Sequence, residues 1–174
     1  MNDYIGIKLE KERIKKVLPH IKGKLLDLGC GNNKLKEVYG KGIGVDVYEW
    51  GNVDLVVNDT SKIPLEEKSV DTITIIAALN HIPNRGKVLD ECHRLLSENG
   101  HLVITMIPPI ISTVWHFLRK PWDIDQSERG MKEGEVYGLK SNQIIALASE
   151  SNFKLKHISS FMFNINKLYV FSKK

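Results

Sequence analysis

One short segment, Leu25-Leu26-Asp27-Leu28-Gly29-Cys30-Gly31, constrains the fold of this chain more than any other. Its apolar residues predict a short buried strand, and its glycines predict a tight turn that closes the strand, because glycine adopts positive φ without a steric penalty. Similar strand character recurs at 42–47, 54–58, 70–79 and 101–107. Helical patterns accompany these strands at 33–39, 85–98 and 141–151. Strands that alternate with helices predict an α/β fold with a doubly wound, mostly parallel sheet.

The ends of these elements carry signals of their own. Asn99-Gly100 predicts a left-handed stop for the helix 85–98. Ser141 is the expected N-cap of the last helix, 141–151. The tail contains two strands, 154–161 and 167–172, which are joined by a short polar corner. This pair must be antiparallel, because a parallel pair needs a long crossover.

The length and charge of the chain favour one domain that binds no nucleic acid. The 174 residues fit a single domain, 1–174, with a sizeable core. The stretch 109–140 is long, charged and aromatic, and segments of this kind are often lids, so we expect it to cover the substrate. The formal net charge is +4, and most Lys and Arg residues are interleaved with Asp and Glu, which makes a nucleic-acid partner unlikely on charge alone.

Other classes of protein are disfavoured by what the sequence lacks. Two cysteines, Cys30 and Cys92, do not form a disulfide framework, so we expect a reduced, cytoplasmic protein. No apolar run reaches the roughly 18 residues that suggest a membrane span. The histidines and carboxylates show no compact ligand spacing, so we expect no metal site.

A nucleotide site is expected where the first strand ends. Ligands of parallel sheets bind at the carboxyl ends of the strands, so the 29–31 turn faces the ligand. The second strand ends in Asp46, which can accept hydrogen bonds from both hydroxyls of a ribose. The G-x-G-x-x-G motif of dinucleotide-binding sites requires a third glycine at the position that Lys34 occupies, so the chain does not match this motif. The pattern therefore favours an adenosine-type ligand without a pyrophosphate.

Several motifs in order resemble the class I S-adenosylmethionine-dependent methyltransferases, specifically the small-molecule "type 11" group. The resemblance covers about 25–107 and rests on these segments: Asp27-Leu28-Gly29-Cys30-Gly31, Asp46, Asn58-Asp59-Thr60, Ala77-Ala78-Leu79-Asn80-His81-Ile82-Pro83, 91–96 and 99–104. It implies a Rossmann-like sheet of seven strands with an antiparallel last strand. It also implies S-adenosyl-L-methionine as cofactor.

The resemblance assigns cofactor contacts to ten residues: Asp27, Gly29, Cys30, Gly31, Asp46, Val47, Asp59, Thr60, Ala77 and Asn80. Within this set, Asp46 takes the ribose, Asp59 the adenine amine and Val47 the adenine face, whereas Cys30 lends its backbone. Each has a simpler alternative as a turn, cap or core residue. The chain departs from the family at Asn33, where a third glycine is usual. Asparagine also tolerates left-handed backbone angles, so the loop is expected to survive.

His81 is the leading catalytic candidate, as a base or as a group that orients the acceptor, because histidine exchanges protons near neutral pH. Its alternative role is to pack against or cap the following helix. His116 is a second candidate. Trp115, Arg119 and Trp122 concentrate aromatic and basic groups that could hold a substrate, an anionic one through Arg119. An amphipathic helix packed on the core is the alternative for this segment.

The leading hypothesis is methyl transfer to a small-molecule acceptor, whose reacting atom the sequence does not specify. A protein or RNA substrate is the alternative, although the Ala78-Leu79-Asn80-His81 segment lacks the Asn/Asp-Pro-Pro-Tyr pattern of amino-group methylation. A catalytically silent protein that binds S-adenosylmethionine is a further alternative. A nicotinamide-dependent oxidoreductase is disfavoured, because the third glycine and a Tyr-x-x-x-Lys pair are missing.

Overall fold

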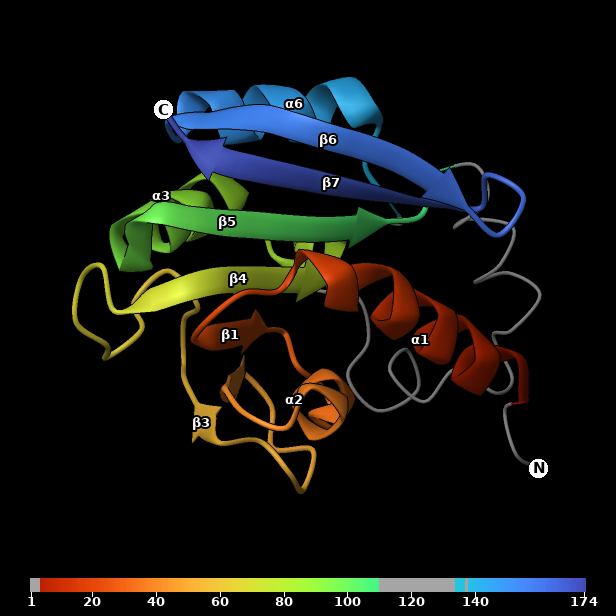
Figure 1. The fold of residues 1–174 in the computed structure, drawn as a ribbon, viewed down its shortest axis with the longest axis horizontal. Coiled ribbons are helices and arrows are strands. Elements are labelled where there is room, and N and C mark those ends of the chain that lie inside the picture. The colour runs from red at the N-terminus through yellow and green to blue at the C-terminus, as the bar shows by residue number, and fades with distance from the viewer. Residues whose placement is uncertain (1–3, 110–133, 137) are drawn as a thin grey trace.

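The computed structural model describes residues 4–109, 134–136 and 138–174. A single sheet of seven strands in the order β3-β2-β1-β4-β5-β7-β6 forms its centre (Figure 1). The strands are β1 (Leu25–Leu28), β2 (Ile43–Asp46), β3 (Leu55–Val56), β4 (Val70–Ile76), β5 (Leu96–Met106), β6 (Phe153–Phe161) and β7 (Asn166–Lys173). Only β7 runs against its neighbours. The predicted α/β fold with a mostly parallel, seven-stranded sheet is confirmed.

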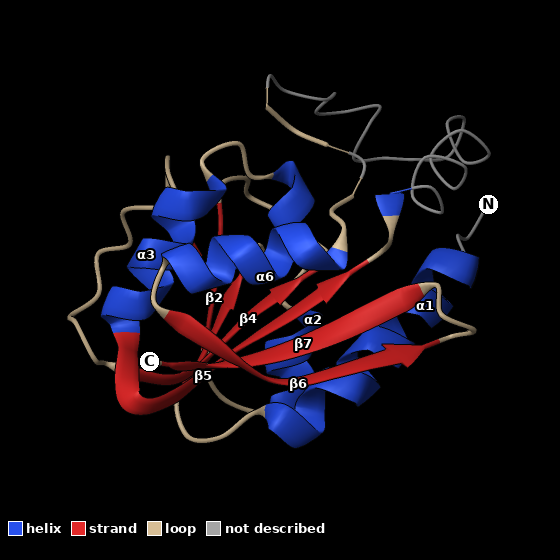
Figure 2. Ribbon diagram, turned by 90° about the horizontal axis from the view of Figure 1, so that it is seen from above, coloured by secondary structure: helices blue, strands red, loops and turns tan. Residues whose placement is uncertain are grey.

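Helices cover both faces of the sheet (Figure 2). The α-helices are α1 (Tyr4–Val17), α2 (Lys34–Tyr39), α3 (Arg85–Leu95) and α6 (Ser141–Glu150), and two short 3-10 helices are η1 (Leu18–His20) and η2 (Leu79–His81). Alternate residues of each strand point to opposite faces, so the sheet makes two cores. In β1, Leu25 packs with α1 and α2, whereas Leu26 packs with α3 and α6.

The central position of β1 follows from its burial. All four of its residues are buried, and it pairs in parallel with both β2 and β4. The register aligns Leu28 with Val45 and Asp27 with Thr74. The carboxyl ends of three adjacent strands therefore lie side by side at one edge of the sheet.

Two predicted boundaries in the middle of the chain are wrong. The strand predicted over 70–79 ends at Ile76, because Ala77 adopts a left-handed φ of 51° and η2 follows. The helix predicted over 85–98 ends at Leu95, and Leu96 is already extended and paired with Val70. The apolar pattern of the sequence shows neither change, because the end of a buried strand and a buried turn contain similar apolar residues.

The predicted caps at Asn99-Gly100 and at Ser141 are also wrong. Gly100 lies inside β5, where a Cβ would meet Ser97 O at 2.9 Å. The glycine therefore allows the chain to pack closely near the point where the register of β4 and β5 shifts. The N-cap of α6 is Lys140, whose N–H donates to Gln143 Oε1 at 2.8 Å. Ser141 is instead the first helical residue, and its hydroxyl contacts β7.

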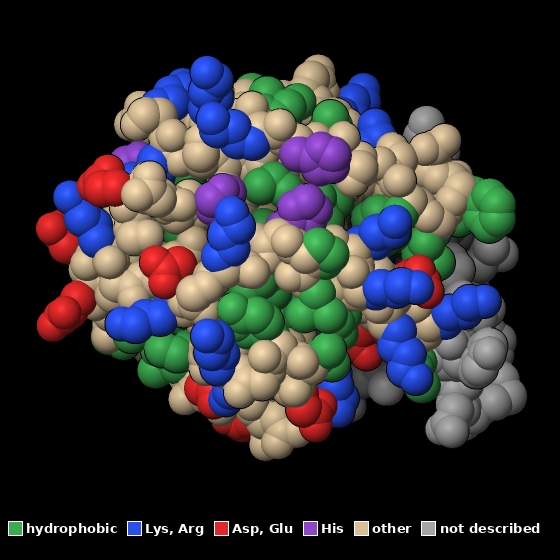
Figure 3. Space-filling model, in the orientation of Figure 1, with side chains coloured by type: hydrophobic (Ala, Val, Ile, Leu, Met, Phe, Trp, Pro, Cys, Tyr) green, Lys and Arg blue, Asp and Glu red, His purple; other side chains and the backbone are tan. Residues whose placement is uncertain are grey.

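Histidine side chains gather on the face shown in Figure 3. The rings of His20 and His157 stack with 5.6 Å between their centroids. Burial, followed by the neighbouring imidazoles of His157 and His101, lowers the pKa of His20, so this ring is neutral at pH 7. No group of His, Cys, Asp and Glu among the described residues could hold a metal ion. The stacked rings therefore act in packing.

The two glycines of the first turn differ in what surrounds them, which gives a testable contrast. Both have positive φ, 73° at Gly29 and 50° at Gly31. A Cβ on Gly29 would lie 2.5 Å from Ala78 Cβ, whereas one on Gly31 would meet nothing within 4 Å. We expect Gly31→Ala to cost only the left-handed strain of about 1–2 kcal/mol. Gly29→Ala should cost about 1–3 kcal/mol more through overpacking. Urea unfolding of both variants measures this, and equal losses would contradict it.

Candidate functional site

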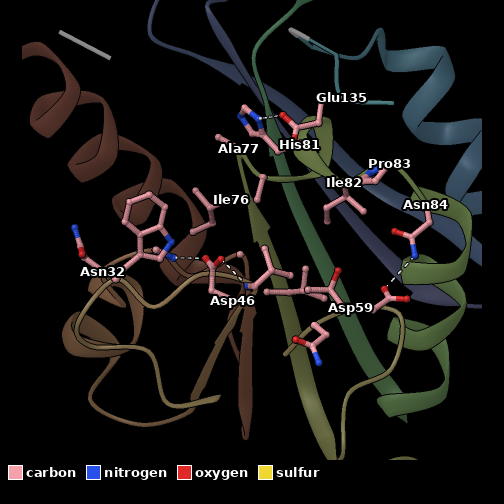
Figure 4. Close-up of a pocket in the computed structure, with 18 of the residues that line it drawn as sticks. Asn32, Asp46, Asp59, Ile76, Ala77, His81, Ile82, Pro83, Asn84 and Glu135 are labelled. Carbon is pink, nitrogen blue, oxygen red and sulfur yellow. Dashed lines mark hydrogen bonds and ion pairs between the residues drawn. The ribbon is translucent and has the colours of Figure 1, made fainter. Parts of the chain in front are cut away.

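A cavity of about 630 Å³ opens at the carboxyl edge of β1, β2 and β4 (Figure 4). This volume is in the range of small-molecule and cofactor sites. Its wall is formed by Glu10, Leu28, Gly29, Gly31, Asn32, Asp46, Val47, Trp50, Asn58, Asp59, Thr60, Ile76, Ala77, Ala78, His81, Ile82, Pro83, Asn84 and Glu135. Residues from six separate parts of the chain thus converge on one hollow.

The glycine turn is held against β2 by backbone hydrogen bonds. The N–H groups of Gly29 and Cys30 both donate to Val45 O, at 2.8 and 3.2 Å. Gly31 N–H donates to Asp46 Oδ2 at 3.0 Å, and Val47 N–H donates to Asp46 Oδ1 at 2.7 Å. The buried Asp46 carboxylate therefore joins the two loops that flank the cavity. Each of its oxygens has more than one lone pair, so it can also accept from a ligand hydroxyl.

Asn33, where the family usually has glycine, keeps the loop conformation as expected, with a φ of 59°. Its Nδ2 donates to Asn52 O and to Asp54 Oδ2, both at 2.8 Å. Its side chain lies directly against β2, because a Cβ on Gly44 would come within 2.2 Å of Asn33 Oδ1. The asparagine thus anchors the loop to the start of β3 while Gly44 provides the space for it.

A second acidic group faces the cavity from the loop after β3. Asp59 Oδ1 accepts hydrogen bonds from Ser61 N–H at 2.8 Å and from Asn84 Nδ2 at 3.0 Å. These bonds, that of Ser61 first, lower the pKa of Asp59, so its carboxylate is ionised at neutral pH. Thr60 beside it is buried. Asp59 and Asn84 lie together on one side of the cavity, apart from Asp46 (Figure 4).

The segment 134–136 is clamped onto η2 at the other end of the cavity. Arg85 donates to Leu79 O, Asn80 O and Gly134 O at 2.9–3.1 Å. Asn80 and Val136 exchange two hydrogen bonds, from Val136 N–H to Asn80 O at 3.0 Å and from Asn80 Nδ2 to Val136 O at 3.2 Å. The clamp fixes the residue between these contacts, Glu135.

Glu135 and His81 form a pair in the cavity wall (Figure 4). His81 Nδ1 lies 3.4 Å from Glu135 Oε2. The side chain of Glu135 is 1% exposed and that of His81 is 24% exposed. A carboxylate at Nδ1 favours the tautomer that carries its proton there, which leaves Nε2 as an acceptor. This geometry suits a proton acceptor as well as a purely structural ion pair.

Acidic side chains predominate among the described residues that line the cavity. Glu10, Asp46, Asp59 and Glu135 contribute four carboxyl groups to its wall. Among the described residues that line it, there is no Lys or Arg. A partly enclosed site with this lining attracts cations and repels phosphates. The cavity is therefore suited to a positively charged ligand and poorly suited to a pyrophosphate.

The predicted site residues divide into three groups. Eight lie in the cavity wall: Gly29, Gly31, Asp46, Val47, Asp59, Thr60, Ala77 and His81. Three lie outside it: Asp27, Cys30 and Asn80. The others, Trp115, His116, Arg119 and Trp122, lie outside the described residues. Most of the predicted substrate-covering segment 109–140 is likewise undescribed.

Asp27 is bonded to the neighbouring strand β4 and is not among the residues that line the cavity. Its Oδ1 accepts from Thr74 Oγ1 at 2.6 Å, and the residue is 3% exposed. Burial raises the pKa of Asp27 to about 7, against the effect of the Thr74 hydrogen bond. Burial also raises the pKa of the Cys30 thiol to about 12, so it stays protonated and is no nucleophile at neutral pH.

The wall residues that the sequence reasoning missed include Glu10, Trp50, Asn84 and Glu135. Trp50 could have been recognised from the sequence. It precedes a glycine and lies four residues after Asp46, and a tryptophan is unusual in a solvent-exposed loop. Glu10 reads as one of several charges on an amphipathic helix. Glu135 lies 54 residues from its partner and has no local signal. Only the packing of α1 and the clamp on η2 bring these two acids to the cavity.

Known sequences match the part of the chain that builds this cavity. The sequence model of the methyltransferase-domain family matches residues 26–104. Residues 26–104 form a methyltransferase domain. The resemblance to the class I, type 11 group is confirmed, and S-adenosylmethionine is the cofactor that this family implies.

Two curated relatives align with part of this chain. A demethylmenaquinone methyltransferase from Thermotoga maritima is 31% identical over 74 residues, which are 40% of this chain and 32% of that protein. A ubiquinone biosynthesis O-methyltransferase from Pseudomonas aeruginosa is 28% identical over 102 residues, 48% of this chain and 44% of that protein. The chain thus spans less than half the length of either relative.

A solved structure shares the fold over nearly the whole chain. It is a methyltransferase from Haloferax volcanii in complex with the Trm112 methyltransferase activator. It matches with a TM-score of 0.70 at 14% identity, over 95% of this chain and 92% of that one. At this identity the likeness is one of fold. Separately, none of the described helices is long and apolar enough to cross a membrane.

The raised pKa of Asp27 predicts an inverse pH dependence of stability. The folded value of about 7 lies above the ordinary value of 3.8. Below pH 3.8 both states are protonated, and between the two values only the folded state holds the proton. The free energy of unfolding therefore falls as pH rises through this window. Asp27→Asn removes this titration. The free energy of unfolding of the variant, relative to that of the wild type, should therefore rise between pH 4 and pH 7 by up to about 4 kcal/mol.

Asp71→Asn is the control of opposite sign. The Lys24 N–H, at 2.8 Å from Asp71 Oδ2, is the leading cause of a lowered pKa for Asp71. That carboxylate stabilises the fold above its ordinary pKa and loses this contribution as pH falls. The free energy of unfolding of Asp71→Asn, relative to that of the wild type, should therefore fall as pH rises. Urea unfolding at a series of pH values measures both variants, and parallel profiles of Asp27→Asn and wild type would refute the assignment.

Proposed function

We propose that this chain is an S-adenosylmethionine-dependent methyltransferase that acts on a small-molecule acceptor. The observation that carries the proposal is the acidic cavity at the glycine turn. Its described lining has four carboxyl groups and no Lys or Arg, and this lining favours a cationic nucleotide derivative. S-adenosylmethionine has a sulfonium and an ammonium against one carboxylate. A nicotinamide dinucleotide would bring a pyrophosphate into the same acidic surroundings, which disfavours it.

The wall residues fit the parts of this cofactor. Asp46 would accept from the ribose hydroxyls, and Asp59 and Val47 would hold the adenine, as the family pattern implies. The methionyl ammonium would need an acidic partner, and the carboxyl of Asp27, a predicted cofactor contact, is instead bonded to Thr74. Glu10, which lines the cavity from α1, takes this role in our proposal. When bound, the cofactor supplies an electrophilic methyl group.

His81 is the proposed base. Its Nδ1 contacts Glu135, and in the tautomer that this contact favours, Nε2 carries the lone pair that would take a proton from the acceptor. His81 Nε2 would take the proton of the acceptor oxygen as that oxygen is methylated, and the bound cofactor would retain the electron pair of its carbon–sulfur bond. Glu135 then stabilises the imidazolium. This assignment favours a hydroxyl acceptor, whose proton must be removed.

The relatives support a small acceptor. One is a demethylmenaquinone methyltransferase and the other a ubiquinone biosynthesis O-methyltransferase, and both names indicate a small-molecule acceptor. A protein or RNA substrate is the second candidate. A silent cofactor-binding protein would bind S-adenosylmethionine and transfer nothing. We further propose a single domain over 1–174, covered at 109–140, and a cytoplasmic location that suits the free thiols of Cys30 and Cys92.

Cofactor binding is the first test. Isothermal titration with S-adenosylhomocysteine should give a dissociation constant in the micromolar range. Asp46→Asn should weaken binding about tenfold or more, because the neutral amide accepts ribose hydroxyls less well than the carboxylate. Asp90→Asn, an exposed change on α3 outside the cavity, should leave the affinity unchanged. No binding by the wild type at millimolar ligand would refute the proposal.

The His81–Glu135 pair is tested by turnover of a panel of phenols and catechols, followed as release of S-adenosylhomocysteine. His81→Gln should lower kcat about 100-fold or more with little change in KM, because a general base contributes about 10²–10⁴ in rate. Glu135→Gln should lower kcat by about tenfold, the loss expected for the partner of a functional histidine. NMR of the His81 ring should show a changed tautomer in Glu135→Gln. Unchanged kcat in both variants would assign the pair a structural role.

A further inference from the structure

A second cavity, of about 230 Å³, lies at the same edge of the sheet where β5 ends and β7 begins. Its wall is made by Met106, Pro108, Pro109, Leu139, Lys140, Ser141, Lys167 and Tyr169. None of these residues lines the first cavity. The site described above therefore leaves this hollow without a role.

The polar groups of this second cavity form a connected donor cluster. Lys167 Nζ donates to Ser141 Oγ at 3.0 Å, and Ser141 Oγ lies 2.9 Å from the Tyr169 hydroxyl. Whichever hydroxyl donates in that second bond, the other keeps its hydrogen for a ligand. Tyr169 is 1% exposed, and burial raises its pKa, so it stays protonated and able to donate.

The charge of this cavity is the reverse of the first. Lys167 and Lys140 line it, the ammonium of Lys167 is bonded to Ser141, and no Asp or Glu is among its described lining residues. The ammonium of Lys167 is half-buried beside Met106, Leu139 and two prolines, a setting that strengthens its interaction with an anion. The first turn of the ten-residue helix α6 begins at Ser141 and adds partial positive charge.

The sheet register places the two cavities close together. Ile76 is aligned with Thr105 on β5, and Met106 is aligned with Lys167 on β7. Ala77, in the wall of the first cavity, donates its N–H to Thr105 O at 3.1 Å. Lys167 is thus two strand spacings from Ala77, roughly 10 Å between their backbones. One small molecule can reach both cavities.

We propose that the second cavity binds an oxyanion of the methyl acceptor, a carboxylate or a phosphate, through Lys167, Ser141 and Tyr169. This inference rests on the proposed function, since it assigns the acceptor to the space between the two cavities. Opposite charges then sort the two substrates, because the cationic cofactor is drawn to the acidic cavity and the anionic acceptor to the basic one. The acceptor class is a compact ring or chain with a nucleophilic group several bonds from its acid group.

The proposal is tested with two probes, benzoate and phenyl phosphate, and with phenol as the neutral control, titrated into protein saturated with S-adenosylhomocysteine. We expect benzoate or phenyl phosphate to bind at least tenfold more tightly than phenol, and the stronger of the two acids to identify the acid group. Lys167→Met should weaken that binding about tenfold, the loss expected for one charge-assisted hydrogen bond. Lys167→Arg, which keeps the charge, should recover most of it.

Lys154→Met is the matched control, because it removes the same charge from an exposed position at the opposite end of β6 and should change nothing. S-adenosylhomocysteine binding by Lys167→Met reports that the variant is folded. If the wild type binds S-adenosylhomocysteine but neither acid, or if Lys154→Met and Lys167→Met lose equally, the anion site is wrong. If the wild type fails to bind S-adenosylhomocysteine, the proposed function itself fails.

Discussion

The attachment of the Gly29–Gly31 turn to β2 is the constraint on which the rest of the site depends. Two backbone bonds to Val45 O and one bond from Gly31 to the Asp46 carboxylate hold the turn in its left-handed geometry. A Cβ on Gly29 would collide with Ala78, so the turn also sets how closely the loop after β4 can approach. The first cavity is the space between these two loops.

Charge separates the two hollows at this edge of the sheet. The larger one presents carboxyl groups and the smaller one ammonium and hydroxyl groups. Methyl transfer from a sulfonium requires a cation and a nucleophile to meet in line, and a polarised edge can orient both before reaction. His81 with Glu135 lies in the wall of the acidic cavity, where a proton acceptor is useful for a hydroxyl acceptor.

Local sequence patterns predicted much of the fold and those residues of the site that follow the strands of the sheet. Alternation of strands and helices indicated the parallel sheet, and the glycine turn, Asp46 and Asp59 were found because strand ends are local features. Boundaries failed where tertiary packing overrides propensity. Gly100 looked like a helix stop but lies in β5, where a Cβ would crowd the chain, and Ser141 looked like a cap but bonds to Tyr169.

By itself, the sequence determined the fold class, the nucleotide-binding edge and the kind of cofactor, because these follow from periodicity and from motifs of a few residues. Only the tertiary structure decided which carboxylates face that edge. Asp27 turned inward to Thr74, whereas Glu10 and Glu135 joined the cavity wall. It alone brought Lys167 and Ser141 together across 26 residues. Contacts between distant segments depend on register and packing, which no local pattern encodes.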